Sequence, residues 1–108
     1  MHDDGLEIER LCDDDGAVRL VLMGELDLVT GQELDAQLRR AGTGGATVRV
    51  DLRALAFMDS SGLRVLLTHV RESRQTGWEL EIGRELSPQV ARLIELVGES
   101  VLWPSADR

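Results

Sequence analysis

The residues with the clearest chemical potential in this sequence lie together at Asp59-Ser60-Ser61-Gly62. An apolar stretch precedes them and a helical pattern follows, so we expect them at the N-terminus of a helix. Backbone N–H groups at such a terminus lack partners and carry a partial positive charge, which favours a phosphate there. Ser60 offers a hydroxyl that could carry one. Aspartate and serine are also ordinary capping residues, so these four residues alone predict only a helix start.

Two strands joined by a polar turn are predicted near the N-terminus. Residues 6–12 mix apolar and acidic side chains, and Asp13-Asp14-Asp15-Gly16 has the composition of a turn. A second apolar run follows, in which Val18, Leu20 and Leu22 alternate with a more mixed set of residues. This alternation is typical of a strand with one buried face. The pattern therefore predicts a β-hairpin.

Helical and strand patterns alternate through the rest of the chain. Helices are expected to start at Thr30, where Thr30 and Glu33 have capping-box spacing, after Asp59, and at Ser87-Pro88. Glycines are placed to end all three helices, and alternating runs between them predict strands. The expected helix-ending glycines are Gly42, Gly77 and Gly98, and the expected strands cover residues 48–52, 78–82 and, as a short last strand, 101–103. Helices linking strands that should lie parallel indicate an α/β fold.

The composition limits both the size and the class of the protein. A chain of 108 residues fits one domain, because domains commonly have about 100 to 150 residues. Residues 1–15 hold seven acidic residues and one arginine, whereas the other 93 residues are close to neutral. No clustered basic surface of the kind that binds nucleic acid is expected. The acidic segment could attract a basic partner or simply improve solubility, and the sequence leaves both interpretations open.

The sequence predicts neither a metal site nor a membrane span. Cys12 is the only cysteine, so it has no partner for an internal disulfide and no second thiol for a metal site. The N-terminus has neither the basic flank nor the apolar run of a signal peptide, and no transmembrane stretch follows. We therefore expect a cytoplasmic protein without a metal or other cofactor.

Three blocks of sequence resemble one known family. They are Gly24-Glu25-Leu26-Asp27, the run Phe57-Met58-Asp59-Ser60-Ser61-Gly62-Leu63, and Ile82-Gly83 leading to Ser87-Pro88. In this order they are similar to STAS-domain anti-sigma factor antagonists. The resemblance implies an α/β, STAS-like single domain with a small mixed sheet of four to five strands and helices mainly on one face. We expect it over residues 6–103, with a flexible acidic N-terminus at 1–5 and a C-terminal tail at 104–108.

The same resemblance implies the function. In this family the serine directly after the aspartate is phosphorylated, which corresponds to Ser60, with Asp59, Ser61 and Gly62 as its supporting neighbours. Asp27 corresponds to an aspartate near that serine, although it could equally be a loop carboxylate before a helix. The unphosphorylated protein would bind an anti-sigma factor serine kinase and so release a sigma factor. Phosphorylation would end binding, and a serine phosphatase would restore it.

Two other functions are weighed against this one. An enzyme is disfavoured because the sequence has no Gly-x-Ser-x-Gly elbow, metal-ligand cluster or phosphate-binding glycine loop. His2 and His69 have no evident partner in the sequence, and His69 is expected to face solvent on its helix. The second alternative is a STAS domain used as an accessory subunit of a lipid transport ATPase or as a stress-sensing scaffold.

Overall fold

A computed structural model describes residues 5–103 of the chain as one mixed sheet with three α-helices. The elements follow in the order β1 (Leu6–Cys12), β2 (Val18–Leu26), α1 (Gly31–Gly42), β3 (Val48–Asp51), β4 (Leu55–Met58), α2 (Ser60–Thr76), β5 (Leu80–Ile82), α3 (Pro88–Val97) and the 3-10 turn η1 (Glu99–Val101). Most of the expected 1–5 segment and all of the 104–108 tail lie outside the described residues.

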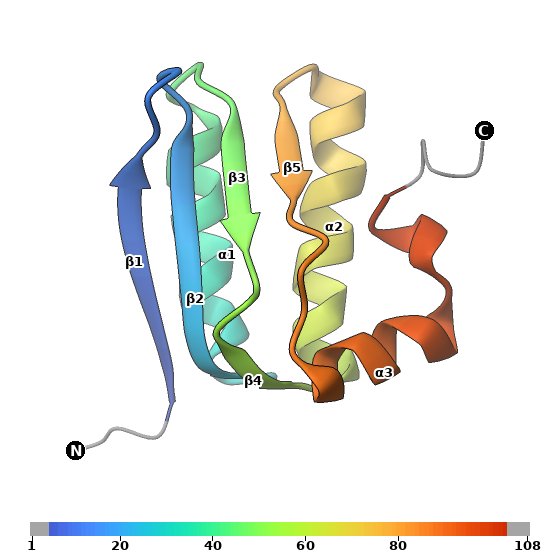
Figure 1. Ribbon diagram of the computed structural model, residues 1–108. Coiled ribbons are helices and arrows are strands. Elements are labelled where there is room, and N and C mark those ends of the chain that lie inside the picture. Colours follow the sequence, from blue (N-terminus) through green and yellow to red (C-terminus); the bar gives the residue numbers. More distant parts are fainter. Residues whose placement is uncertain (1–4, 104–108) are drawn as a thin grey trace.

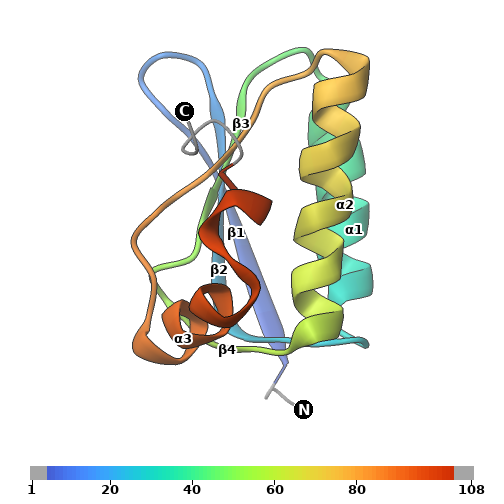
Figure 2. The same ribbon diagram turned by 90° about the vertical axis from the view of Figure 1, so that its right-hand side faces the viewer.

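The sheet has the strand order β1-β2-β3-β5, and β4 pairs with the C-terminal end of β2 (Figure 1). β1 and β2 form the predicted antiparallel hairpin, whereas β3 and β4 lie parallel to β2, and β5 lies parallel to β3. Figure 2 shows α1 and α2 side by side on one face of this sheet, with α3 apart from them near β4. The predicted mixed sheet with helices mainly on one face is confirmed.

The core lies between the sheet and these two helices. Leu20 and Leu22 of β2 are fully buried, as the alternating pattern predicts. Apolar residues on the inner sides of α1 and α2 pack against them, because their helical spacing places them on one face. These helix residues are Leu34, Leu38 and Ala41 of α1 and Leu63, Leu66 and Val70 of α2.

Gly77 ends α2 as predicted, in a left-handed conformation with φ of 88°. The predicted last strand at 101–103 is wrong, because the chain there forms η1 instead. Backbone N–H groups of Leu102 and Trp103 both donate to the carbonyl of Glu99, so they bond locally rather than to a neighbouring strand. The indole N–H of Trp103 donates to the carbonyl of Ile82 over 2.6 Å, which holds this segment against the sheet.

Thr30 and Ser87 are the N-cap residues of α1 and α3, where these helices were expected to start, but neither side chain makes a capping hydrogen bond. Thr30 has helical backbone angles and makes no side-chain cap. Its hydroxyl lies 2.9 Å from the carbonyl of Glu25 and accepts the N–H of Asp27, so it is not available to cap α1. The Ser87 hydroxyl donates to the carbonyl of Leu55 over 2.7 Å and thereby ties the start of α3 to β4.

His69 is buried, which corrects the expectation that it faces solvent. Only 1% of its side chain is exposed, and its Nε2 lies 2.7 Å from Oδ1 of Asp35 on α1. The sequence pattern missed this contact because its partner comes from a different helix. His69 therefore connects the two helices that cover the sheet.

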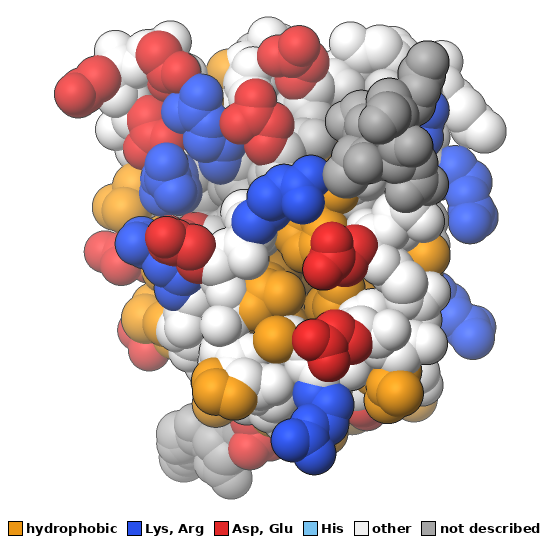
Figure 3. Space-filling model, turned by 45° about the vertical axis from the view of Figure 1, so that its right-hand side comes forward, with side chains coloured by type: hydrophobic (Ala, Val, Ile, Leu, Met, Phe, Trp, Pro, Cys, Tyr) orange, Lys and Arg blue, Asp and Glu red, His pale blue; other side chains and the backbone are white. Residues whose placement is uncertain are grey.

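The outer face of the sheet carries a network of arginine and acidic side chains (Figure 3, upper left). Arg19 and Arg49 are direct partners on parallel strands, where two like charges repel each other. Asp13 from the hairpin turn lies between them, with Oδ2 at 2.9 Å from Arg19 and 2.8 Å from Arg49. Asp15 adds a second carboxylate at 2.6 Å from Arg49. Part of the acidic N-terminal segment thus balances arginines of the same chain.

This network predicts an acid-sensitive contribution to stability. The hydrogen bond from Arg49 lowers the pKa of Asp15 from its ordinary value of 3.8 to about 2. A carboxylate whose pKa is lower in the folded state stabilises the fold above its unfolded pKa, and this stabilisation is lost as the pH falls through the folded value. At low salt, Asp15→Asn should lower the melting temperature at pH 7, and the difference from wild type should shrink steadily between pH 4 and pH 2.

Circular dichroism melts of both proteins across this range would measure the difference. Asp14→Asn is the matched control, because Asp14 is exposed and has no ion pair among residues 5–103. It should leave the melting temperature close to that of the wild type. A difference between Asp15→Asn and wild type that is equally large at pH 2 and pH 7 would contradict this explanation.

Candidate functional site

The candidate site lies where the end of β2 meets the start of α2. Leu26 and Met58 are partners on the parallel strands β2 and β4, so the residues that follow them emerge at the same edge of the sheet. The carbonyl of Leu26 accepts the backbone N–H of Asp59 over 3.2 Å. This pairing places Asp27 and Asp59 on adjacent segments. The structure thus joins two of the three sequence blocks that suggested the site.

Asp59 is the N-cap of α2. Its backbone is extended, and its Oδ1 accepts the N–H of Gly62 over 2.9 Å, as expected for a helix-capping aspartate. The carbonyl of Asp59 accepts the N–H of Leu63. The Asp59 carboxylate therefore fixes the first turn of the helix.

Ser60 is the first residue of α2, and its side chain is exposed. Within residues 5–103, neither its hydroxyl nor its backbone N–H has a hydrogen-bond partner. Ser61 follows it and is half-buried. An exposed hydroxyl beside unpaired N–H groups at a helix N-terminus is chemically suited to carry a phosphate, as the sequence predicts.

Gly62 is required by a close approach between α2 and β2. A Cβ atom at this position would lie 2.5 Å from the carbonyl oxygen of Leu26 and 2.8 Å from its Cγ. Both distances are shorter than the contacts that side chains tolerate. The glycine thus lets the start of α2 rest directly on the end of β2.

Asp27 shapes the loop between β2 and α1. Its Oδ1 accepts the backbone N–H groups of Val29 and Thr30 over 3.1 and 2.9 Å. These hydrogen bonds, with those from Thr30 as the largest cause, lower the pKa of Asp27 and keep it ionised. The sequence left two interpretations of Asp27 open, and the structure shows that it acts as a loop carboxylate. Asp27 also directly follows Leu26, whose carbonyl accepts the N–H of Asp59.

Exposed apolar side chains flank the site, and the sequence analysis did not single them out. Leu28 and Val29 follow Asp27 and are 69% and 72% exposed, and Phe57 precedes Asp59 and is 38% exposed. The signal was present in the sequence, because two apolar residues stand in a segment predicted to be a loop. Gln89 was also missed; its side-chain oxygen accepts the N–H of Met58 and so supports β4 from α3.

The contact at Gly62 predicts the effect of adding one methyl group. Gly62→Ala should displace the start of α2 from Leu26 and lower the free energy of unfolding by about 1 to 3 kcal/mol, the usual cost of overpacking. Urea unfolding followed by circular dichroism would measure this change.

Gly44→Ala provides the matched control, because a Cβ there would lie 3.4 Å from the carbonyl oxygen of Ala41, an ordinary contact. It should change the free energy of unfolding by less than about 0.5 kcal/mol. Equal stability of Gly62→Ala and wild type would show that the approach to Leu26 is not tight.

The relatives found by comparison with known sequences include two that are classed as anti-sigma factor antagonists. BtrV of Bordetella bronchiseptica, classed as an anti-sigma factor antagonist, is 32% identical over 94 residues, which cover 86% of this chain and 80% of BtrV. The anti-sigma-B factor antagonist of Bacillus subtilis is 27% identical over 81 residues, covering 75% and 73% of the two chains.

Solved structures agree with this likeness. The anti-sigma factor antagonist SpoIIAA in its unphosphorylated form superimposes with a TM-score of 0.71 at 28% identity, covering 91% of this chain and 84% of that chain. The Bacillus protein SpoIIAA in its phosphorylated form gives a TM-score of 0.66 at 27% identity, covering 91% and 86%. An antagonist from Mycobacterium paratuberculosis, at 23% identity and a TM-score of 0.70 over 92% and 83%, shows the fold.

The family match covers most of the described structure. Residues 10–102, from β1 to the residue after η1, match the family described as "Mlab, STAS domain". The serine turn and its Asp27 neighbour both lie inside this range. The match confirms the resemblance inferred from the three sequence blocks, and the chain belongs to the STAS domain family.

Proposed function

We propose that this protein is an anti-sigma factor antagonist that works by partner switching. In its unphosphorylated form it binds an anti-sigma factor serine kinase, and the bound sigma factor is released. The kinase phosphorylates Ser60 and thereby ends the binding, and a serine phosphatase restores the active form. The observation that carries this proposal is the exposed Ser60 hydroxyl, which has no hydrogen-bond partner among residues 5–103 and lies at the start of α2.

The charges around Ser60 support a switch that needs no change of fold. A phosphoserine carries about −1.5 to −2 charges at neutral pH. The Asp59 carboxylate is held in the adjacent cap, and Asp27 is kept ionised in the neighbouring loop. Phosphorylation would therefore add charge to a site that is already acidic, and a partner surface fitted to a neutral hydroxyl would lose affinity.

The apolar side chains beside the site support partner binding. Leu28, Val29 and Phe57 lie on the two segments that hold Asp27 and Asp59. Burying such exposed apolar side chains favours association, and an added charge nearby would oppose it. The surface thus combines a source of affinity with a group that can turn it off.

Ser60 is better explained as a phosphate acceptor than as a catalytic nucleophile. Activation of a serine requires a general base within hydrogen-bond reach, and no side chain among residues 5–103 makes that contact. His69 is buried against Asp35 instead. The same residues hold no cluster of three metal-ligating side chains. We propose a regulatory binding protein of the cytoplasm rather than an enzyme, and the support for this is the similarity to anti-sigma factor antagonists.

A second candidate is an accessory STAS subunit of a lipid transport ATPase. The description of the matching family names Mlab and a STAS domain but no anti-sigma factor antagonist. The family match alone therefore does not separate the two roles. Among residues 5–103, no helix is both long and apolar enough to cross a membrane. Co-purification with a membrane transporter rather than a soluble kinase would favour the accessory role.

The Ser60 switch predicts opposite behaviour of two variants. Ser60→Ala should bind the kinase as tightly as the unphosphorylated protein and should not be phosphorylated. Ser60→Asp should bind at least about tenfold more weakly, a loss of about 1.4 kcal/mol, because it introduces a like charge beside Asp59. Capture from lysates of the native cells, followed by mass spectrometry and titration with the captured kinase, would measure both effects.

Thr68→Asp is the matched control, since Thr68 is exposed on the same helix two turns further along. It should leave kinase binding unchanged. Intact mass and site mapping of the protein from its native cells should find one phosphate on Ser60. An unmodified Ser60 under growth and stress conditions, or tight binding by Ser60→Asp, would count against the proposal.

A further inference from the structure

His69 contains a buried hydrogen-bonding atom without a partner. Its Nε2 lies 2.7 Å from Asp35, whereas its Nδ1 has no hydrogen-bond partner among residues 5–103. The nearest acidic oxygen to Nδ1 is Oε1 of Glu72 at 3.7 Å, beyond hydrogen-bond distance. A buried polar atom that lacks a partner costs free energy, so this arrangement calls for an explanation.

The partner of Nε2 determines what Nδ1 can do. The hydrogen bond with His69, followed by that from Arg39, lowers the pKa of Asp35, so this carboxylate is ionised and can only accept a hydrogen bond. Nε2 must therefore carry the proton. In the neutral ring Nδ1 is then an acceptor, as is the Glu72 carboxylate beside it.

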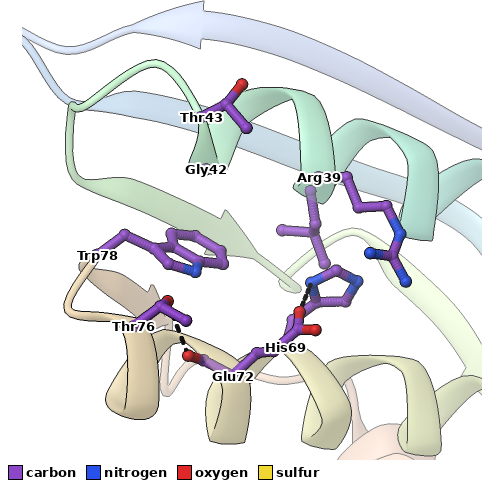
Figure 4. A pocket seen from close by; sticks show the side chains of 8 residues that line it. Arg39, Gly42, Thr43, His69, Glu72, Thr76 and Trp78 are labelled. Atoms are coloured by element: carbon purple, nitrogen blue, oxygen red, sulfur yellow. Dashed lines mark hydrogen bonds and ion pairs between the residues drawn. The ribbon is translucent and has the colours of Figure 1, made fainter.

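A groove of about 580 Å³ opens beside these two acceptors, between the C-terminal halves of α1 and α2 (Figure 4). Trp78 lies at one end of the groove and His69 at the other. The Trp78 ring packs so closely on α1 that a Cβ at Gly42 would lie 3.1 Å from it. The groove thus has a flat aromatic wall and an acidic end.

We propose that this groove binds a small primary amine with a flat apolar body. An ammonium group carries three N–H donors, so it can donate to His69 Nδ1 and to Glu72 at the same time. Its charge complements Glu72, and its apolar body would pack on the Trp78 ring. Arg39 also lines the groove, but its closest ion pair is with Asp35 over 3.0 Å, so Arg39 and Asp35 largely balance each other and Glu72 leaves this end of the groove acidic. A carboxylate ligand would instead meet two acceptors.

Access to Nδ1 requires the Glu72 side chain to turn. Its side chain is 45% exposed on the surface of α2, so a change of rotamer meets little obstruction. His69 lies nine positions after Ser60, which corresponds to roughly 13 Å along the helix axis. Amine binding is therefore separate from the Ser60 switch, and either proposal can fail without the other.

Titration followed by the indole N–H signals in ¹H–¹⁵N NMR spectra would test the proposal. The two probes are 2-phenylethylamine and 3-phenylpropanoate, which share an aromatic body and carry opposite charges. The amine should shift the Trp78 signal in a saturable way, and the acid should not. The Trp103 signal should stay in place, because that indole is buried and bonded to Ile82.

Variants separate the groove from a general charge effect. Glu72→Gln keeps the size of this partly exposed side chain, so the variant should fold. The loss of the negative charge should weaken amine binding about tenfold or more. Glu95→Gln, an exposed acid on α3, and Ser60→Ala should both bind the amine like wild type. The proposal is wrong if the amine gives no saturable shift, if the acid binds equally well, or if Glu72→Gln binds unchanged.

Discussion

The carbonyl of Leu26 holds the start of α2 against the end of β2, and the geometry of the serine turn depends on this contact. It accepts the N–H of Asp59, and its closeness leaves room only for glycine at position 62. With a larger residue there, α2 would have to move away, and Ser60 and the loop at Asp27 would separate. The glycine of the serine block is thus explained by a contact between segments 36 residues apart in the sequence.

This contact also explains how the site can be both rigid and chemically available. Asp59 uses its carboxylate to cap the helix, and Asp27 uses its own to close the loop before α1. Neither carboxylate bonds to the Ser60 hydroxyl, although both contribute negative charge nearby. A phosphate on Ser60 would therefore change the charge of the surface while the backbone hydrogen bonds that define it remain in place.

The sequence predicted the features that depend on local pattern. Alternation predicted the β1–β2 hairpin, helical patterns predicted α1 and α2, and Gly77 was correctly placed at the end of α2. The errors at Ser87, His69 and Trp103 have a different origin, because these side chains bond to partners on other elements, which the local pattern does not include. The Thr30 hydroxyl instead bonds within its own loop, to Glu25 and Asp27. The Ser87 hydroxyl reaches β4 and His69 reaches α1, while Trp103 packs on the sheet without forming a strand.

The arginine network on the outer face of the sheet bears on where a partner can bind. Arg19 and Arg49 face each other in register, so Asp13 and Asp15 are needed to offset their repulsion. Asp13 and Asp15 are already paired with these arginines, so they are poor candidates for attracting a basic partner. Arg19 and Arg49 are thus balanced by carboxylates of the same chain. Exposed apolar side chains and an unbonded hydroxyl coincide instead at the edge formed by β2, β4 and the start of α2, and partner binding there would leave this network intact.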